Sequence, residues 1–207
     1  MTHWFFDFDG TLCDTDADIR LAWRRVIGLL GRECPQFDAL YKTGPRLDVM
    51  ARQLFPDADD ALVARVRELF QPAYDECGFP NTRPYPWVAG WLAGLRGRGD
   101  RLYLATNKRV RPLRLLLAKL GWESWFDAVY APDMAGDGRL PSKGELLRGA
   151  LAAHGIASED AVMVGDTRGD IEAGREARMR TVGCTWGYGS REDLEGADEL
   201  YNAARFA

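Results

Sequence analysis

Short runs of apolar, β-branched and aromatic residues alternate along the chain with longer segments whose apolar positions recur at helical spacing. The runs lie at His3–Phe8, Arg101–Thr106, Asp127–Ala131, Ala161–Gly165 and Thr181–Thr185. Because these runs are apolar on both faces, they predict strands of a parallel sheet that helices cover on both sides. The pattern therefore predicts an α/β fold, with a Rossmann-like three-layer α/β/α core and right-handed crossovers between strands.

The interval between the first two predicted strands is about three times longer than a βαβ unit of roughly 30 residues requires. This excess predicts a helical domain inserted over residues 14–83, between the two parts of a core domain over 1–13 and 84–207. The insertion contains three apolar stripes at helical spacing: Ile19, Trp23, Val26, Ile27 and Leu30; Leu47, Met50 and Leu54; Leu62, Val63, Val66, Leu69, Phe70 and Tyr74. An insertion after the first strand follows the sheet edge where α/β proteins bind ligands, so we expect it to act as a cap.

Composition and charge exclude several classes of protein. The 207 residues are 46% hydrophobic and 28% charged, as in an ordinary globular protein. Twenty-seven basic residues against 31 acidic ones give no general electrostatic reason to bind nucleic acid or an anionic membrane. No apolar run approaches the length of a membrane span. Four scattered cysteines favour a reduced protein. The first nine residues contain Asp7 and Asp9 where a signal peptide would have a basic and then an apolar stretch, which favours a cytoplasmic protein.

Three of the predicted strands end in polar residues that lead into a turn or a helix. These residues are Asp7, Asp9, Thr106, Asn107, Asp166 and, four residues further on, Asp170. Any one of them alone could be a turn or helix-capping residue. Because the carboxyl ends of parallel strands share one edge of the sheet, we expect the whole set to lie close together.

Four carboxylates at one edge would repel each other strongly unless a cation lay among them. Carboxylate oxygens without nearby histidine or cysteine suit Mg²⁺, and the chain has only two histidines, His3 and His154. Asp7 and Asp9 can face the same side of a strand end, and Gly10 lets the backbone turn there. The sequence therefore predicts a magnesium site that includes aspartates.

Lysine is rare in this chain, which narrows the choice of a cationic site residue. The lysines are Lys42, Lys108, Lys119 and Lys143. Lys143 follows Ser142 in the pattern Ser142-x-x-Glu145, which predicts a capping box and places Lys143 at the start of a helix. A compact ammonium suits a place beside a carboxylate better than a planar guanidinium does. We therefore expect Lys143, rather than Lys108 after the second strand, to serve in the site.

At four motifs the chain resembles the haloacid dehalogenase-like phosphohydrolases. The motifs are Asp7-Phe8-Asp9-Gly10-Thr11-Leu12, Thr106-Asn107-Lys108, Lys143, and Gly165-Asp166-Thr167-Arg168-Gly169-Asp170. The chain also resembles the phosphoglycolate phosphatase-like branch of this family, which has a helical cap, in its insertion, in Arg83-Pro84-Tyr85-Pro86 and in Thr185-Trp186-Gly187-Tyr188-Gly189-Ser190. The resemblance implies a cytoplasmic, Mg²⁺-dependent phosphatase that acts on a small phosphate ester, as a monomer or homodimer.

The same resemblance implies a role for each motif residue. Asp7 would be the nucleophile that forms an aspartyl-phosphate, and Asp9 the general acid and base. Mg²⁺ would be held by the Asp7 carboxylate, the Asp9 carbonyl and Asp166, with Asp170 anchoring a metal-bound water. The phosphoryl group would be bound by Gly10, Thr11, Thr106, Asn107 and Lys143.

Substrate choice is expected to depend on the turn Thr43-Gly44-Pro45-Arg46, in which Pro45 suits the first position of a helix. Gly44 could bring backbone close to a ligand, and Arg46 could bind a carboxylate or a second phosphate, although a solvated connector is an alternative. 2-Phosphoglycolate fits such a contact. A nucleotidase or an inorganic pyrophosphatase remains open as an alternative.

Three further alternatives are weaker. Related sugar-phosphate mutases have a histidine where this chain has Ile19. A phosphonate hydrolase would need a cap lysine, for which Lys42 is the candidate. A non-catalytic phosphate-binding module would have no reason to retain every motif residue.

Overall fold

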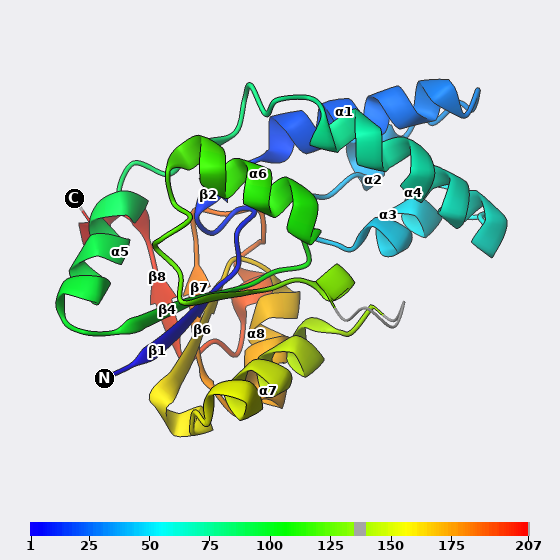
Figure 1. Cartoon of the computed structure of the whole chain (residues 1–207). Coiled ribbons are helices and arrows are strands. Elements are labelled where there is room, and N and C mark those ends of the chain that lie inside the picture. The colour runs from blue at the N-terminus through cyan, green and yellow to red at the C-terminus, as the bar shows by residue number, and fades with distance from the viewer. Residues whose placement is uncertain (135–139, 207) are drawn as a thin grey trace. The chain divides into compact units, whose positions relative to one another are not determined.

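The computed structural model describes residues 1–134 and 140–206 (Figure 1). The chain divides into two compact units, one of residues 1–14 with 84–207 and one of residues 15–83. Two short strands, β2 (Cys13–Asp14) and β3 (Arg83–Pro84), pair with each other where the chain passes between the units. That the second unit serves as a cap stays a prediction.

The first unit is built on a six-stranded sheet in the order β5-β4-β1-β6-β7-β8. The strands are β1 (His3–Phe6), β4 (Arg101–Ala105), β5 (Ala128–Tyr130), β6 (Ala161–Gly165), β7 (Arg180–Cys184) and β8 (Glu199–Tyr201). All neighbouring pairs run parallel, which confirms the predicted α/β fold. The edge strand β8 escaped prediction because it is three residues long and only Tyr201 in it is buried.

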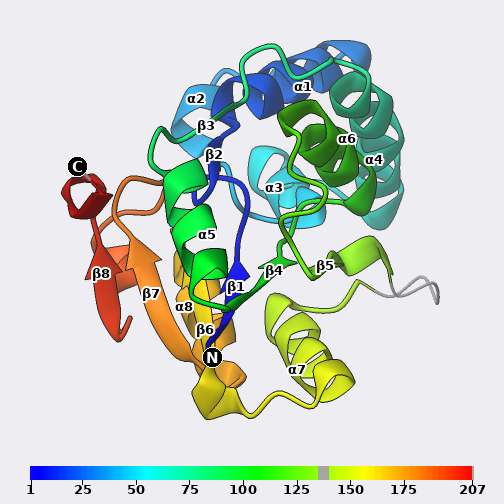
Figure 2. The same ribbon diagram turned by 60° about the vertical axis from the view of Figure 1, so that its left-hand side comes forward.

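Both faces of this sheet are buried, as the apolar runs predict. On one face Phe5 stacks on Tyr103 with ring centroids 4.6 Å apart, and Met163 and Leu147 of α7 (Lys143–His154) belong to the same core cluster. On the other face Phe6 meets the edge of Trp91 in α5 (Val88–Gly97), with ring centroids 5.2 Å apart. Figures 1 and 2 show α5 on one side of the sheet and α7 and α8 (Arg168–Glu176) on the other. The first unit therefore has three layers.

The helices of the first unit differ in how they are capped, and α7 has suitable residues at both of its ends. The helices are α5 (Val88–Gly97), α6 (Val110–Leu120), α7 (Lys143–His154) and α8 (Arg168–Glu176), with 3₁₀ turns at Pro132–Met134, Ser158–Asp160, Glu192–Leu194 and Ala203–Phe206. The predicted capping box of α7 is present: Glu145 N–H donates to Ser142 Oγ at 3.2 Å, and Ser142 N–H donates to Glu145 Oε2 at 2.8 Å. Gly155 ends α7 in the left-handed region, at φ 61°.

Strand order fixes where a ligand can bind in this unit. From β1 the chain moves outward through β4 and β5, then crosses back to β6 on the other side of β1. The crevice beyond the carboxyl ends of β1 and β6 is therefore the point where the strand order reverses, which is where open α/β sheets bind ligands. Asp7 follows β1 and Asp166 follows β6, so two predicted site residues flank this point.

The second unit is helical, as its apolar stripes predict. Its helices are α1 (Asp16–Leu29), α2 (Phe37–Leu40), α3 (Leu47–Leu54) and α4 (Asp60–Asp75). Trp23 of α1 packs on Phe70 of α4 with centroids 5.2 Å apart. One detail of the prediction is wrong: α3 begins at Leu47 with Arg46 as its N-cap, so Pro45 precedes the helix and does not occupy its first position.

Asp18 ties the first helix of this unit to the end of the insertion. Its buried carboxylate accepts hydrogen bonds from the backbone N–H groups of Asn81 and Thr82, from the Asn81 side-chain amide and from the Thr82 hydroxyl, at 2.8–3.2 Å.

None of the helices that the structure describes combines the length and the apolar character that a membrane span needs.

Replacing Asp18 with alanine should destabilise the second unit by about 3 kcal/mol, because buried donors lose a charged acceptor. Amide hydrogen exchange in α1 and α4 measures this free energy. Asp38→Ala is the matched control, since Asp38 is 67% exposed and its ion pairs should contribute much less. Equal protection in wild type and Asp18→Ala would contradict the structural role of Asp18.

Candidate active site

The chain turns sharply after β1 and presents Asp7 and Asp9. Asp7 N–H donates to Val164 O at 2.9 Å, which continues the pairing of β1 with β6. Gly10 then adopts φ 84° and donates its N–H to Cys13 O at 2.8 Å. A side chain at Gly10 would collide with the carboxylate of Asp166, so both the conformation and the close approach require glycine.

Asp166 lies directly after β6 and is fully buried. Thr11 Oγ1 donates to its Oδ1 at 2.8 Å, and Tyr188 N–H donates to its Oδ2 at 2.7 Å. Side chains at Gly187 or Gly189 would overlap Asp166, so the loop that carries Tyr188 must pass it as bare backbone. Thr11, predicted as a phosphoryl ligand, therefore uses its hydroxyl here to orient Asp166.

The Gly187–Tyr188–Gly189 loop is a site element to which the sequence analysis assigned no role. Its family resemblance was visible, but a backbone N–H carries no side-chain signal. The two glycines flanking an aromatic residue were the available signal, because they mark a place where backbone approaches another group closely. Tyr188 also donates its hydroxyl to Asp14 Oδ1 at 2.9 Å.

Lys143 joins the carboxylates of two elements. It is the first residue of α7, it is buried, and its Nζ donates to Asp7 Oδ1 at 2.9 Å and to Asp170 Oδ1. The other oxygen of Asp170 accepts hydrogen bonds from Thr167 N–H at 3.0 Å and from Thr167 Oγ1 at 2.6 Å. Asp170 is thereby fixed at the first turn of α8, with both of its oxygens engaged.

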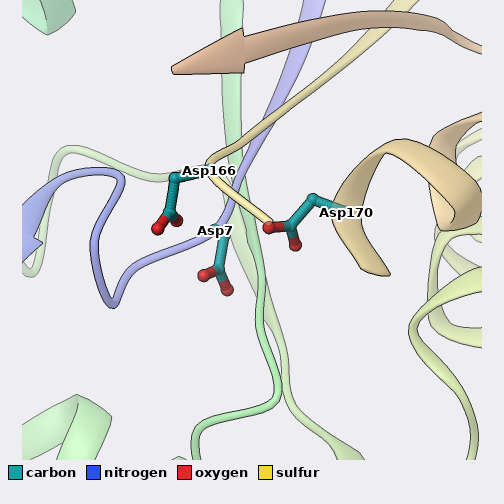
Figure 3. A group of neighbouring side chains, drawn as sticks. All are labelled: Asp7, Asp166 and Asp170. Carbon is teal, nitrogen blue, oxygen red and sulfur yellow. The ribbon is translucent and has the colours of Figure 1, made fainter. Parts of the chain in front are cut away.

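Asp7, Asp166 and Asp170 gather into one buried carboxylate cluster, and Figure 3 shows the three side chains from their separate segments pointing toward a common space. One oxygen of each lies within 4.8 Å of the others. Oxygen donors at this spacing, without histidine or cysteine, have the character of a site for a hard divalent cation.

The residues after β4 lie in the same unit. Thr106 is buried and donates its N–H to Tyr130 O at 3.1 Å, while its hydroxyl oxygen accepts the Lys108 N–H at 3.1 Å. Asn107 is half-buried. These placements put the Thr106 hydroxyl on the turn that also positions Lys108.

Lys108 is a second buried lysine of the site, and the sequence analysis passed it over. Its Nζ lies 2.8 Å from Asp9 Oδ1 and 3.1 Å from Asp9 Oδ2. The side chains of Lys108 and Asp9 are 3% and 12% exposed, so this ion pair is shielded from solvent. Its sequence signals were the rarity of lysine and its place in the motif Thr106-Asn107-Lys108, but neither of them indicates a contact with Asp9.

The charges of these side chains do not cancel. The carboxylates of Asp7, Asp9, Asp166 and Asp170 carry four negative charges when ionised, and the two lysines, Lys143 and Lys108, supply two positive ones. Two negative charges remain, which is the charge that one divalent cation neutralises. Uncompensated charge is costly at buried positions, so the residues present fit such a cation.

The pKa values of the site carboxylates also reflect the excess of negative charge. Burial, with the nearby charges of Asp170 and Asp9, raises the pKa of Asp7 to about 6 although Lys143 opposes the rise. Burial and the charges of Asp170 and Asp7 also raise the pKa of Asp166 well above its usual value. For Lys143, burial lowers the pKa, but the carboxylates of Asp170 and Asp7 outweigh it and leave a raised pKa. Lys143 therefore remains charged throughout the physiological range.

Two predicted substrate residues, Gly44 and Arg46, belong to the second unit. Gly44 adopts φ 114°, which favours glycine. Arg46 forms a two-bond ion pair with Asp48, with Nε and Nη2 donating to the two carboxylate oxygens at 3.1 and 3.2 Å. A substrate anion at Arg46 would have to compete with this carboxylate.

The chain is similar in sequence to known hydrolases. A family model described as haloacid dehalogenase-like hydrolase matches residues 4–184. The phosphoglycolate phosphatase of Aquifex aeolicus is 32% identical over 185 residues, which cover 88% of this chain and 84% of that protein. The 5'-nucleotidase of Pseudomonas aeruginosa is 27% identical over 203 residues, covering 98% and 90%.

A solved structure shows that the fold is shared. The crystal structure of a predicted phosphatase from Clostridium acetobutylicum superposes with a TM-score of 0.88 and 24% identity, and the match covers 99% of this chain and 94% of that chain.

The stabilisation of the protein by Mg²⁺ should depend on pH. Because folding raises the pKa of Asp7 from 3.8 to about 6, the contribution of Asp7 to the stability of the metal-free protein is fully present below pH 4 and is lost as pH rises through 6. A cation must displace that proton, so the rise in Tm caused by Mg²⁺ should be small at pH 5 and large at pH 8.

Thermal unfolding with and without Mg²⁺ between pH 5 and 8 measures this effect. Asp166→Asn, which removes a charged member of the carboxylate cluster, should lose most of the rise at every pH. A Mg²⁺-induced rise in Tm that is the same at pH 5 and pH 8 would contradict binding of the cation at carboxylates whose pKa values are raised.

Proposed function

Because this chain belongs to the haloacid dehalogenase-like hydrolases, we propose that it is a phosphatase that hydrolyses small phosphomonoesters through an aspartyl-phosphate on Asp7. The observation that carries this proposal is the carboxylate cluster at the point where the strand order reverses, with Lys143 hydrogen-bonded to Asp7, the proposed nucleophile. The negative charge of this cluster would repel a phosphate. A phosphate can bind here only because a cation and the two lysines offset that charge.

The cation proposed is Mg²⁺, because hard carboxylate oxygens in a small buried space suit it. Asp7 and Asp166 would hold it, with the Asp9 carbonyl as a further ligand and Asp170 orienting a bound water. When bound, it would neutralise charge on the transferring phosphoryl group.

In the first step an Asp7 carboxylate oxygen forms a bond to phosphorus while the bond from phosphorus to the ester oxygen breaks. Lys143 holds the other Asp7 oxygen at a fixed angle through its 2.9 Å contact, if Oδ2 is the attacking atom. Asp9 delivers a proton to the departing ester oxygen, so that an alcohol leaves. The hydroxyl of Thr106, the amide of Asn107 and backbone at Gly10 would bind the phosphoryl oxygens.

In the second step water attacks phosphorus and the bond to Asp7 breaks. Asp9, now a carboxylate, takes the proton from that water, and inorganic phosphate leaves. Asp9 therefore has to serve both steps from one position. Its placement two residues after Asp7, directly before the turn at Gly10, separates the two carboxylates by one residue of backbone.

The substrate proposed is a small anionic ester such as 2-phosphoglycolate, and the similarity to a phosphoglycolate phosphatase supports it. A 5'-nucleotidase activity is the second candidate, since a 5'-nucleotidase is also among the relatives. Phosphate release from a panel of phosphate esters, with Mg²⁺ present or removed by chelator, separates these candidates. A cytoplasmic location and a monomeric or homodimeric state stay predictions.

Asp7→Asn should reduce kcat to less than about one part in a thousand, because an amide oxygen is a far weaker nucleophile than a carboxylate. Phosphate release from p-nitrophenyl phosphate with Mg²⁺ measures this loss, and far-UV circular dichroism checks that the fold is intact. Asp38→Asn, at an exposed position of the second unit, is the matched control. Residual activity above that level would remove Asp7 from the nucleophile role.

Arg46→Ala tests the predicted cap contact. If Arg46 exchanges Asp48 for the substrate carboxylate, its loss should lower kcat/KM for 2-phosphoglycolate about tenfold, the size expected of one charged hydrogen-bonding contact. Asp48→Ala, which removes the competing carboxylate, should not lower it. An unchanged kcat/KM in Arg46→Ala would refute a substrate role for Arg46.

A further inference from the structure

We propose that Lys108 selects substrates whose leaving group carries a negative charge close to the ester oxygen. The proposal rests on the proposed phosphatase function, in which Asp9 acts on that oxygen. Lys108 holds both oxygens of the Asp9 carboxylate, at 2.8 and 3.1 Å. It therefore faces the one side chain that must meet the leaving group.

The reach of Lys108 follows from that contact. To transfer a proton, Asp9 has to come within about 3 Å of the ester oxygen. The Lys108 ammonium is 2.8 Å from Asp9 Oδ1. When Asp9 contacts the ester oxygen, the ammonium therefore lies roughly within hydrogen-bonding distance of groups attached close to the ester oxygen. In 2-phosphoglycolate the carboxylate carbon is two bonds from the ester oxygen, so its carboxylate enters this space.

Electrostatics give Lys108 a reason to be there. Once Asp9 has given its proton to the ester oxygen, it is a carboxylate beside the acidic leaving group, and two carboxylates repel each other strongly where water is excluded. Lys143, the other buried lysine, contacts Asp7 and Asp170, so its charge is directed to the nucleophile. Lys108 cancels the charge of Asp9 and offers an ammonium to the second carboxylate, which a neutral leaving group does not need.

Local structure keeps this ammonium in place. Lys108 is only 3% exposed as a side chain, and its backbone N–H is bonded to Thr106 Oγ1 at 3.1 Å. Its Nζ also lies 5.8 Å from the centroid of the Phe8 ring, on the turn that carries Asp9. A long side chain held at both ends presents its charge without losing further freedom when substrate binds.

The test compares two esters that differ at one group: 2-phosphoglycolate, with a carboxylate, and 2-hydroxyethyl phosphate, with a neutral hydroxymethyl group. In Lys108→Met, kcat/KM for 2-phosphoglycolate should fall at least tenfold more than kcat/KM for 2-hydroxyethyl phosphate. The neutral ester corrects for any effect on Asp9, and the ratio is unaffected by a partly unfolded sample. Lys108→Arg should retain most of the preference, because it keeps the charge.

Lys119→Met, at an exposed position of α6, is the matched control and should leave the ratio unchanged. Lys108→Gln replaces Lys108→Met if the latter fails to fold. An equal loss for both esters in the Lys108 variants would overturn the proposal, and so would a wild type that hydrolyses both equally well. If wild type releases no phosphate even from p-nitrophenyl phosphate, the proposed function itself is wrong.

Discussion

Four carboxylates are buried at one edge of a parallel sheet, and two buried lysines compensate half of their charge. Lys143 is bonded to Asp7 and Asp170, and Lys108 to Asp9. Two negative charges remain among these side chains, and a divalent cation would balance them. Without a cation these carboxylates carry excess negative charge. A bound cation would neutralise it and could also stabilise negative charge that develops in the transition state.

The elements around the site stabilise the fold and also position the groups that contact the buried carboxylates. The capping box of α7 fixes the residue that begins the helix, and that residue is Lys143. The bare backbone of the loop at Gly187 and Gly189 lets an N–H reach Asp166. A substitution at Gly187 or Gly189 would therefore disturb Asp166 of the carboxylate cluster before it disturbed the sheet.

Much of the architecture could be predicted because its signals are local. Apolar runs gave five of the strands, the Ser142-x-x-Glu145 pattern gave the start of α7, and polar residues at strand ends gave the carboxylate cluster. The Lys108 contact could not be predicted, because it joins residues 99 positions apart and depends on side-chain direction. The Tyr188 N–H could not be predicted either, because any residue type except proline could supply it.

Binding of Mn²⁺, a paramagnetic substitute for Mg²⁺, tests the charge balance most directly. Electron paramagnetic resonance titration should show one saturable Mn²⁺ per chain in wild type, competed by Mg²⁺, and none at the same concentrations in Asp166→Ala. Absence of saturable binding in wild type, or a site that survives in Asp166→Ala, would contradict a single divalent cation held by the buried carboxylate cluster.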